Sequence, residues 1–200
     1  MAFFTALVVA VLLPYCAVAL PEGPPVARHR EVCTSMSPRG HHPTNGATGP
    51  APYTIQVSNS SYIKGQPVQV TVRANSGVTF AGFFVQARAE AAGSETTALG
   101  TFSNAALGSQ LFLCSSEGGA WGHSNKNSKT VMTASWTPPS NETRTIVFRA
   151  TVVQGPASMW WEGIKSQPLP YGAAASGQAS ASLLVTTAAV VSALLMAWMH

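Results

Sequence analysis

The chain contains no aspartate and few charged residues of any kind. Asp, Glu, Lys and Arg make up 9% of its 200 residues, whereas an ordinary soluble domain has about 25%. Without aspartate, the chain lacks the carboxylate of an Asp-His catalytic pair and the usual acidic ligands of a calcium-binding EF-hand loop. Its serine-rich stretches also lack the Gly-x-Ser-x-Gly motif of many hydrolases. The sequence therefore indicates a protein that is not an enzyme and that carries no cofactor.

Basic residues are spread along the chain and form no dense run. The formal net charge is +4, and every Lys, Arg and Glu lies between Glu22 and Lys165. Nucleic-acid-binding proteins usually gather their cations into a patch, so nucleic acid is not an expected partner. The mild positive charge leaves two interpretations open: a solvated surface, or weak attraction to anionic glycans and bacterial surfaces.

The first 19 residues are typical of a secretory signal peptide. Their apolar run has the right length and is short for a membrane span, and Ala-Val-Ala at 17–19 supplies the small-x-small cleavage pattern. We expect cleavage after Ala19, which removes Cys16 and leaves a mature chain that begins near Leu20. Residues 20–32 contain several prolines and are predicted to be an extended linker. The protein is therefore expected outside the cell or at its surface.

The C-terminal end combines small residues with an apolar tail. Residues 168–182 form an uncharged spacer rich in Ala, Ser and Gly, and residues 183–200 are mostly apolar. This order matches a glycosylphosphatidylinositol (GPI) attachment signal, for which Gly172 and Ser176 are the candidate attachment residues. A single membrane-spanning tail is the alternative, although the segment is short and no Lys or Arg follows it. An unprocessed tail is the third interpretation.

Removal of the signal peptide leaves two cysteines, Cys33 and Cys114. An even pair of cysteines in an exported chain indicates a disulfide, and the pair lacks the spacing of metal ligands. Asn59, in Asn-Ser-Ser, and Asn141, in Asn-Glu-Thr, are glycosylation acceptor motifs at turn-like positions. We therefore predict a disulfide-bonded glycoprotein.

The middle of the chain predicts short β-strands separated by turns. Residues 67–73 alternate Val with Gln, Thr and Arg, which is the period of a half-buried strand. Further strands are expected over residues 53–57, 79–87, 111–114, 131–136 and 145–153, with turns at Lys64-Gly65, Asn75-Ser76-Gly77, Gly118-Gly119 and Pro138-Pro139. No stretch keeps a helical period, and residues 37–52 are expected to be extended coil along the domain edge. The spacing predicts an all-β fold, a two-sheet sandwich.

A series of short motifs follows in order along this middle part. They are Cys33-Thr-Ser-Met36-Ser-Pro38, His42, Pro52-Tyr53-Thr-Ile55, Tyr62-Ile-Lys-Gly65-Gln-Pro-Val68, Phe80-Ala-Gly82-Phe83-Phe-Val-Gln86-Ala87-Arg88, Gly100-Thr-Phe102, Cys114, His123-Ser124-Asn125 with Lys129, Trp136-Thr-Pro138-Pro139, Val147-Phe148-Arg-Ala150-Thr151, Trp160-Trp161 and Ile164. In order and spacing, residues 33–167 resemble the reeler domain of reelin, spondins, ferric-chelate reductase-like proteins and small insect defence proteins. The resemblance implies an immunoglobulin-like antiparallel sandwich with a disulfide between Cys33 and Cys114. Spondin-type relatives carry a second disulfide, for which this chain has no cysteine.

The histidines His41, His42 and His123 raise the question of a metal site. No carboxylate or further ligand is paired with them, so a framework role near the cysteine segments is preferred and no metal is predicted.

Four side chains are candidates for a ligand surface: Arg88, His123, Trp160 and Trp161. The two tryptophans are either a pair that caps the sandwich core or an exposed platform for a ligand, and core packing is the preferred interpretation.

Two functions are compatible with these features. The first is an extracellular binding module, in innate defence, that engages a microbial surface, a glycan or matrix. The second is an adhesion or structural protein that contacts another cell-surface protein and is held at the membrane by its C-terminal anchor. Ferric-chelate reductase-like relatives place electron transfer in a haem-bearing membrane domain that has no equivalent here, so that relationship implies ancestry only.

Overall fold

The computed structural model describes residues 22–38, 46–90, 96–155 and 159–172. The predicted signal peptide, the apolar tail, His41, His42 and Ser176 lie outside the described residues. Within the described ranges, no helix has the length and apolar character that crossing a membrane requires.

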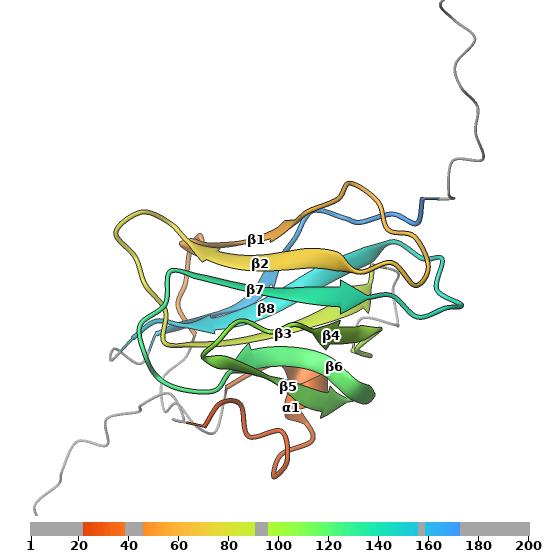
Figure 1. Cartoon of the computed structure of the whole chain (residues 1–200). Helices are drawn as coiled ribbons and strands as arrows, with labels where there is room; N and C mark the ends of the chain where they lie inside the picture. The colour runs from red at the N-terminus through yellow and green to blue at the C-terminus, as the bar shows by residue number, and fades with distance from the viewer. Residues whose placement is uncertain (1–21, 39–45, 91–95, 156–158, 173–200) are drawn as a thin grey trace, which may run out of the picture.

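Two antiparallel sheets form a sandwich, as the strand pattern predicts (Figure 1). The four-stranded sheet has the order β1-β2-β7-β4, with β1 (Tyr53–Val57), β2 (Val68–Ala74), β7 (Val131–Thr137) and β4 (Thr101–Ser103). The five-stranded sheet has the order β5-β6-β3-β8-β9, with β5 (Ser109–Cys114), β6 (Ser116–His123), β3 (Gly82–Ala89), β8 (Ile146–Val153) and β9 (Trp160–Lys165). The predicted fold class, an all-β two-sheet sandwich, is confirmed.

The space between the sheets is filled by alternate residues of each strand. In β2 every second residue is buried, beginning with Val68, as the alternation predicts. Large aromatic rings complete this core in edge-to-face pairs: the ring centroids of Phe83 and Trp121 lie 4.8 Å apart, and those of Trp136 and Phe148 lie 5.2 Å apart. Such pairs stabilise a core beyond the area that they bury.

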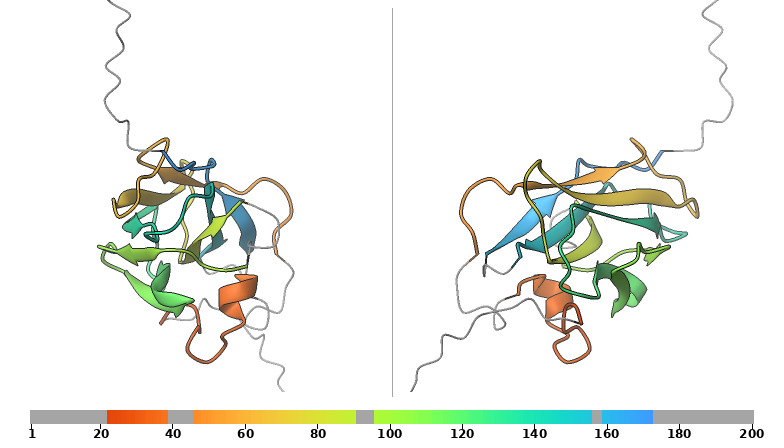
Figure 2. Two further views of the ribbon diagram at one scale, coloured as in Figure 1. Left: turned by 90° about the vertical axis from the view of Figure 1, so that its right-hand side faces the viewer. Right: turned by 60° about the vertical axis from the view of Figure 1, so that its left-hand side comes forward.

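The outer face of the five-stranded sheet is covered as well. All eight residues of β3 are buried, which a half-exposed strand would not allow. The cover is formed by residues 22–38, called here the N-terminal cover, which contain the short helix α1 (Val32–Ser35). Figure 2 shows α1 on the side of the sandwich away from β1 and β2. Apolar side chains of the cover, Val26, Val32 and Met36, form a small second core with Phe84, Ala98, Cys114 and Ala120.

The cover corrects the expectation that residues 20–32 form an extended linker. Residues 25–31 are mostly turns that lead into α1, a helical turn that was not expected from the sequence. The physical reason is the apolar outer face of β3, which must be buried. No short-range period in the sequence signals a four-residue helix.

The predicted turn at Gly118-Gly119 is also wrong, because both residues lie inside β6. A side chain at Gly119 would begin 1.9 Å from the carbonyl oxygen of Cys114, and one at Gly118 would begin 2.9 Å from that of Phe102. These glycines therefore allow close approach of neighbouring strands rather than a change of direction. Three strands, β4, β6 and β9, were not expected from the sequence.

The strand directions divide the loops between two ends of the sandwich. The β1–β2 and β7–β8 connections lie at the end where the described chain stops, at Tyr171 and Gly172. The β2–β3, β4–β5 and β6–β7 connections lie at the opposite end, called here the distal end (Figure 1).

Candidate functional site

The predicted disulfide is present and ties the N-terminal cover to the sheet. Cys33 in α1 and Cys114 at the end of β5 are bonded, with their Cα atoms 5.5 Å apart and a sequence separation of 81 residues. A bridge across so long a loop stabilises a fold by about 4 kcal/mol in the chain-entropy model. The prediction from the cysteine count is confirmed.

Arg88 is buried under this cover and not on a ligand surface. Its side chain is 4% exposed, and its guanidinium donates hydrogen bonds to the carbonyl oxygens of Cys33 (2.8 Å) and Thr34 (3.0 Å) and to Gln86 Oε1 (2.7 Å). A cation near the C-terminal carbonyls of a helical turn is favourable. Arg88 therefore holds the cover in place, and its assignment as a surface residue is corrected.

His123 is likewise a framework residue. Its ring is buried, and Nδ1 lies 3.1 Å from both the amide nitrogen and the carbonyl oxygen of Phe83 on the neighbouring strand. Among the described residues, no three His, Cys, Asp or Glu side chains are close enough to hold a metal ion. The structure thus does not place His123 on a ligand surface.

The tryptophan pair belongs to the sandwich and its edge. Trp160 is fully buried and its indole N–H donates to Glu162 Oε1 at 2.9 Å. Trp161 is half-buried and packs edge-to-face on Tyr53, with the ring centroids 5.4 Å apart. Burial excludes Trp160 as an exposed platform, but Trp160 clusters with Val153 apart from the inter-sheet core. Trp161 packs against that core, so the core interpretation holds for Trp161.

The structure brings together a different set of residues, the loops of the distal end. We call residues 75–81, 104–108 and 124–130 the distal loop cluster. The amide nitrogens and carbonyl oxygens of Phe80 and Lys129 bond each other at 2.9 and 2.8 Å, and Ser124 N donates to Gly108 O at 3.0 Å. These bonds join all three loops, so the cluster is held in one conformation.

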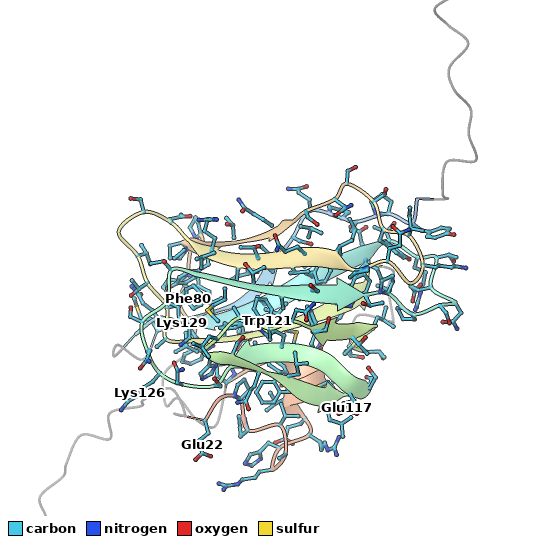
Figure 3. The ribbon with its side chains drawn as sticks, viewed as in Figure 1. Glu22, Phe80, Glu117, Trp121, Lys126 and Lys129 are labelled. Atoms are coloured by element: carbon cyan, nitrogen blue, oxygen red, sulfur yellow. A yellow bond between two sulfur atoms is a disulfide. The ribbon has the colours of Figure 1, made fainter. Side chains whose placement is uncertain are left out.

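The buried ammonium of Lys129 fixes the centre of this cluster. Its Nζ donates to the carbonyl oxygens of Ala81 (3.0 Å), Asn125 (2.9 Å) and Asn127 (2.7 Å), and to Asn125 Oδ1 (3.1 Å). The residue is 8% exposed, and this burial lowers the pKa of the Lys129 amine. Figure 3 shows Lys129 beside Phe80, with Lys126 farther out at the same end. Lys129 occurs in the motif series, but nothing in the sequence shows that it binds carbonyl groups.

The distal loop cluster is cationic. Its three segments contain no Asp or Glu, and Lys126 is exposed within it. Arg73, at the end of β2, is also exposed and pairs with Val131 at the start of β7. The distal end therefore carries positive charge without a compensating carboxylate in these loops.

Apolar side chains also project from the distal end. Leu107, in the β4–β5 turn, is fully exposed, and Val131 and Met159 are 42% and 45% exposed. The other two exposed large apolar side chains of the described residues, Leu111 and Leu113, lie on the edge strand β5. Single exposed apolar side chains are common on protein surfaces, so Leu107 is informative only together with the cations at the same end.

A groove lies between the N-terminal cover and β5. It is lined by Glu22, Gly23, Pro24, Pro25, Ala27, Arg28, Gln110 and Phe112. A cation and a carboxylate both stand on its rim, so the groove has no single preferred ligand charge.

The opposite end carries the glycosylation motifs and the exit of the chain. Asn59 and Asn141 are both exposed, in the β1–β2 and β7–β8 connections. Tyr62 joins these connections: its hydroxyl donates to Arg144 O at 2.8 Å, and its carbonyl accepts from Gly172 N at 2.9 Å. Both predicted glycans would thus stand beside the point where the described chain ends.

Glu142, inside the second glycosylation motif, is buried and makes an ion pair with the more exposed Arg144. Its carboxylate accepts from Arg144 Nε at 2.8 Å and from Arg144 Nη2 at 2.6 Å, and also from the backbone amides of Thr143 and Arg144. The side-chain hydrogen bonds from Arg144 lower the pKa of Glu142 to about 2. This ion pair could not be predicted from the sequence, because residues two apart in a loop face each other only in particular turns.

Comparison with known proteins matches most of the chain to one family. The reeler domain model matches residues 31–176. "Putative defense protein" of Bombyx mori is 34% identical over 143 residues, covering 68% of this chain and 79% of that protein. "Putative defense protein Hdd11" of Hyphantria cunea is 32% identical over 160 residues, covering 77% and 90%.

Two further relatives limit what can be transferred. "Putative ferric-chelate reductase 1" of Danio rerio is 31% identical over 145 residues, but the chain spans only 24% of its length. The crystal structure of the human F-spondin reeler domain (fragment 1) matches with a TM-score of 0.52 and 20% identity, covering 64% of this chain and 94% of that one. That likeness supports the observed sandwich. The chain belongs to the reeler domain family.

Proposed function

We propose that this protein is an extracellular, non-enzymatic binding module that engages microbial surfaces through its distal loop cluster. The observation that carries the proposal is the cluster itself: three cross-bonded loops with exposed Lys126 and no carboxylate. Loops held in one conformation lose less entropy on binding, and a positive field favours anionic partners. The names of the insect relatives are consistent with a role in defence.

The arrangement of the two ends supports a tethered form of this module. A GPI anchor or membrane-spanning tail after residue 172 would hold the end that carries Asn59 and Asn141, and would leave the distal loops pointing away. Gly172 is bonded to Tyr62 and stands against Ser61, so Ser176 is the attachment site that we favour. Release of the protein from intact cells by a phosphatidylinositol-specific phospholipase would support GPI attachment.

Adhesion to another cell-surface or matrix protein is the alternative use of the same tethered domain. Ferric-chelate reduction is not proposed, since this chain spans a quarter of that relative.

Binding of the purified full-length product to Gram-negative and Gram-positive bacteria tests the proposal. Lys126→Glu should weaken binding about fivefold or more, because a cation near an anionic surface contributes roughly 1 kcal/mol. Lys165→Glu is the matched control: Lys165 is an exposed lysine on β9, outside the distal loop cluster. Absence of bacterial binding, or equal effects of the two variants, would contradict the proposed function.

A further inference from the structure

We infer that the distal end binds an anionic phospholipid bilayer, with Leu107 inserted among the lipids and Lys126 and Arg73 against the headgroups. The inference rests on the proposed function, because it uses the same loops and names the chemistry of their partner. Two observations lead to it: the position of Leu107 and the charge around it.

Leu107 is held at the tip of a short, well-bonded turn. The flanking bonds run from Ala106 N to Thr133 O (3.0 Å) and from Ser109 N to Ala106 O (3.1 Å), and Ser109 Oγ donates to the same Ala106 oxygen (2.6 Å). Gly108 follows with a φ of +88°, a conformation that favours glycine. The backbone therefore fixes the leucine outward, at 101% exposure. Transfer of such a side chain into hydrocarbon is favourable.

The charges around this tip match an anionic surface. Lys126 is exposed on the loop that is bonded to Gly108, since the neighbouring Ser124 donates to the carbonyl of that glycine. Arg73 is exposed at the same end of the four-stranded sheet. Glu22 of the N-terminal cover is a carboxylate close to these loops, because Gln110 Nε2 donates to the carbonyl oxygens of both Glu22 and His123 (Figure 3). The two cations Lys126 and Arg73 outnumber it at this end. Juxtamembrane cations are attracted to anionic lipid within about 8 Å at physiological salt.

Glycan recognition is the competing chemistry: the distal loops expose polar side chains such as Asn104 and Asn127 that could bond a sugar, but their one aromatic ring is not exposed. Aromatic faces are a common platform for ligands at protein surfaces, yet Phe80, the aromatic residue of these loops, is fully buried. Trp160 is buried as well. A branched aliphatic side chain has no hydrogen-bonding group to offer a sugar. The leucine side chain itself is better matched by lipid than by carbohydrate.

The turn that carries Leu107 lies at the end of the sandwich opposite to Gly172. The described chain ends at Gly172, at the opposite end of the sandwich. A form tethered through its C-terminus would therefore present Leu107 to a second membrane rather than to its own.

Vesicle binding tests this inference on the full-length chain. The product expressed in animal cells carries an epitope tag after Gly172 and is captured on antibody-coated beads, washed free of detergent, and mixed with fluorescent vesicles. We expect binding to vesicles of phosphatidylglycerol and phosphatidylcholine, weak binding to phosphatidylcholine alone, and a loss at high salt. Leu107→Asn should raise the half-saturating lipid concentration about tenfold or more, from the free energy of burying one leucine.

The controls separate this inference from the proposed function. Leu113→Asn removes an exposed leucine from the β5 edge, and Lys165→Glu reverses a charge elsewhere; both should bind vesicles like the wild type. Vesicle binding that Leu107→Asn leaves unchanged would overturn the inference. Binding to bacteria without binding to vesicles would also overturn it, would identify a glycan or protein ligand, and would leave the proposed function standing. Failure to bind either would refute both.

Discussion

Replacement of Lys129 by methionine is expected to destabilise the fold and loosen the distal loop cluster. Methionine keeps the apolar stem but removes the donor that binds three carbonyl oxygens and Asn125 Oδ1. Because burial lowers the pKa of the amine, the ammonium gains little over its state in water. The cost of the substitution arises instead from the oxygens left without a donor.

The size of the effect follows from those oxygens. A buried acceptor without a partner costs about 1–3 kcal/mol, and loop carbonyls near the surface regain water in part. For three carbonyls and one amide oxygen, we expect a net loss of roughly 2–4 kcal/mol in the free energy of unfolding. In a domain of this size that corresponds to a fall in Tm of roughly 4–16 °C.

Thermal unfolding followed by tryptophan fluorescence measures this loss, and hydrogen exchange locates it. Amides of residues 124–130 and of Phe80 should exchange faster in Lys129→Met. Lys126→Met is the matched control, since Lys126 is exposed, and its effect should stay within about 0.5 kcal/mol. Equal melting temperatures and equal exchange in both variants would show that Lys129 does not hold the loops, and would refute the reasoning.

Two further predictions concern the Glu142–Arg144 ion pair and the disulfide of the N-terminal cover. The pKa of Glu142 falls from 4.5 to about 2 in the folded chain, so its contribution to stability is present above pH 4.5 and is lost as the pH falls toward 2. Urea unfolding at a series of pH values should show that up to about 3 kcal/mol of the free energy of unfolding is lost in this way. The variant Glu142→Gln, which keeps the Asn-x-Thr motif, should lack this acid-dependent loss. An identical loss in both proteins would argue against the ion pair. Replacement of Cys33 and Cys114 by serine should cost about 4 kcal/mol and should open the N-terminal cover to proteolysis at Arg28 or Arg30 without unfolding the sheets at neutral pH. Resistance of the cover equal to that of the wild type would mean that Arg88 and the apolar contacts suffice.

The sequence predicted the parts of the fold that obey a local period. Strands β1, β2 and β7 were expected within two residues of their bounds, because a half-exposed strand alternates its side chains. β8 was also expected, although it is buried on both faces, because its residues are β-branched or apolar almost throughout. β6 was missed because its glycines suggested a turn, whereas they serve the approach of neighbouring strands. The N-terminal cover was missed because it forms in order to bury the outer face of β3, which lies some fifty residues later in the chain.

The candidate site was harder to predict, for a related reason. Arg88, His123 and Trp160 are the residue types that often bind ligands, and a strand that is buried on both faces gives no sign of which side chains reach solvent. Lys129 was noticed as part of a motif, but its partner Ala81 lies 48 residues away. The exposure of Leu107 could not be predicted from the sequence, because an apolar residue in a turn can be either packed or exposed.

Arg88 and Lys129, the buried arginine and lysine of the described residues, share one chemistry. Arg88 donates to the carbonyls of the N-terminal cover, and Lys129 donates to those of the distal loops. Backbone carbonyls are supplied by every residue type, so these attachments depend little on which side chains the cover and the loops carry. Within the described residues, Lys126 and Leu107 make no side-chain hydrogen bond that holds the loops, so the residue types at these two positions can follow the requirements of binding. The positions that hold the cluster are therefore separate from those that we propose to bind, and substitutions at the two sets should be distinguishable by stability alone.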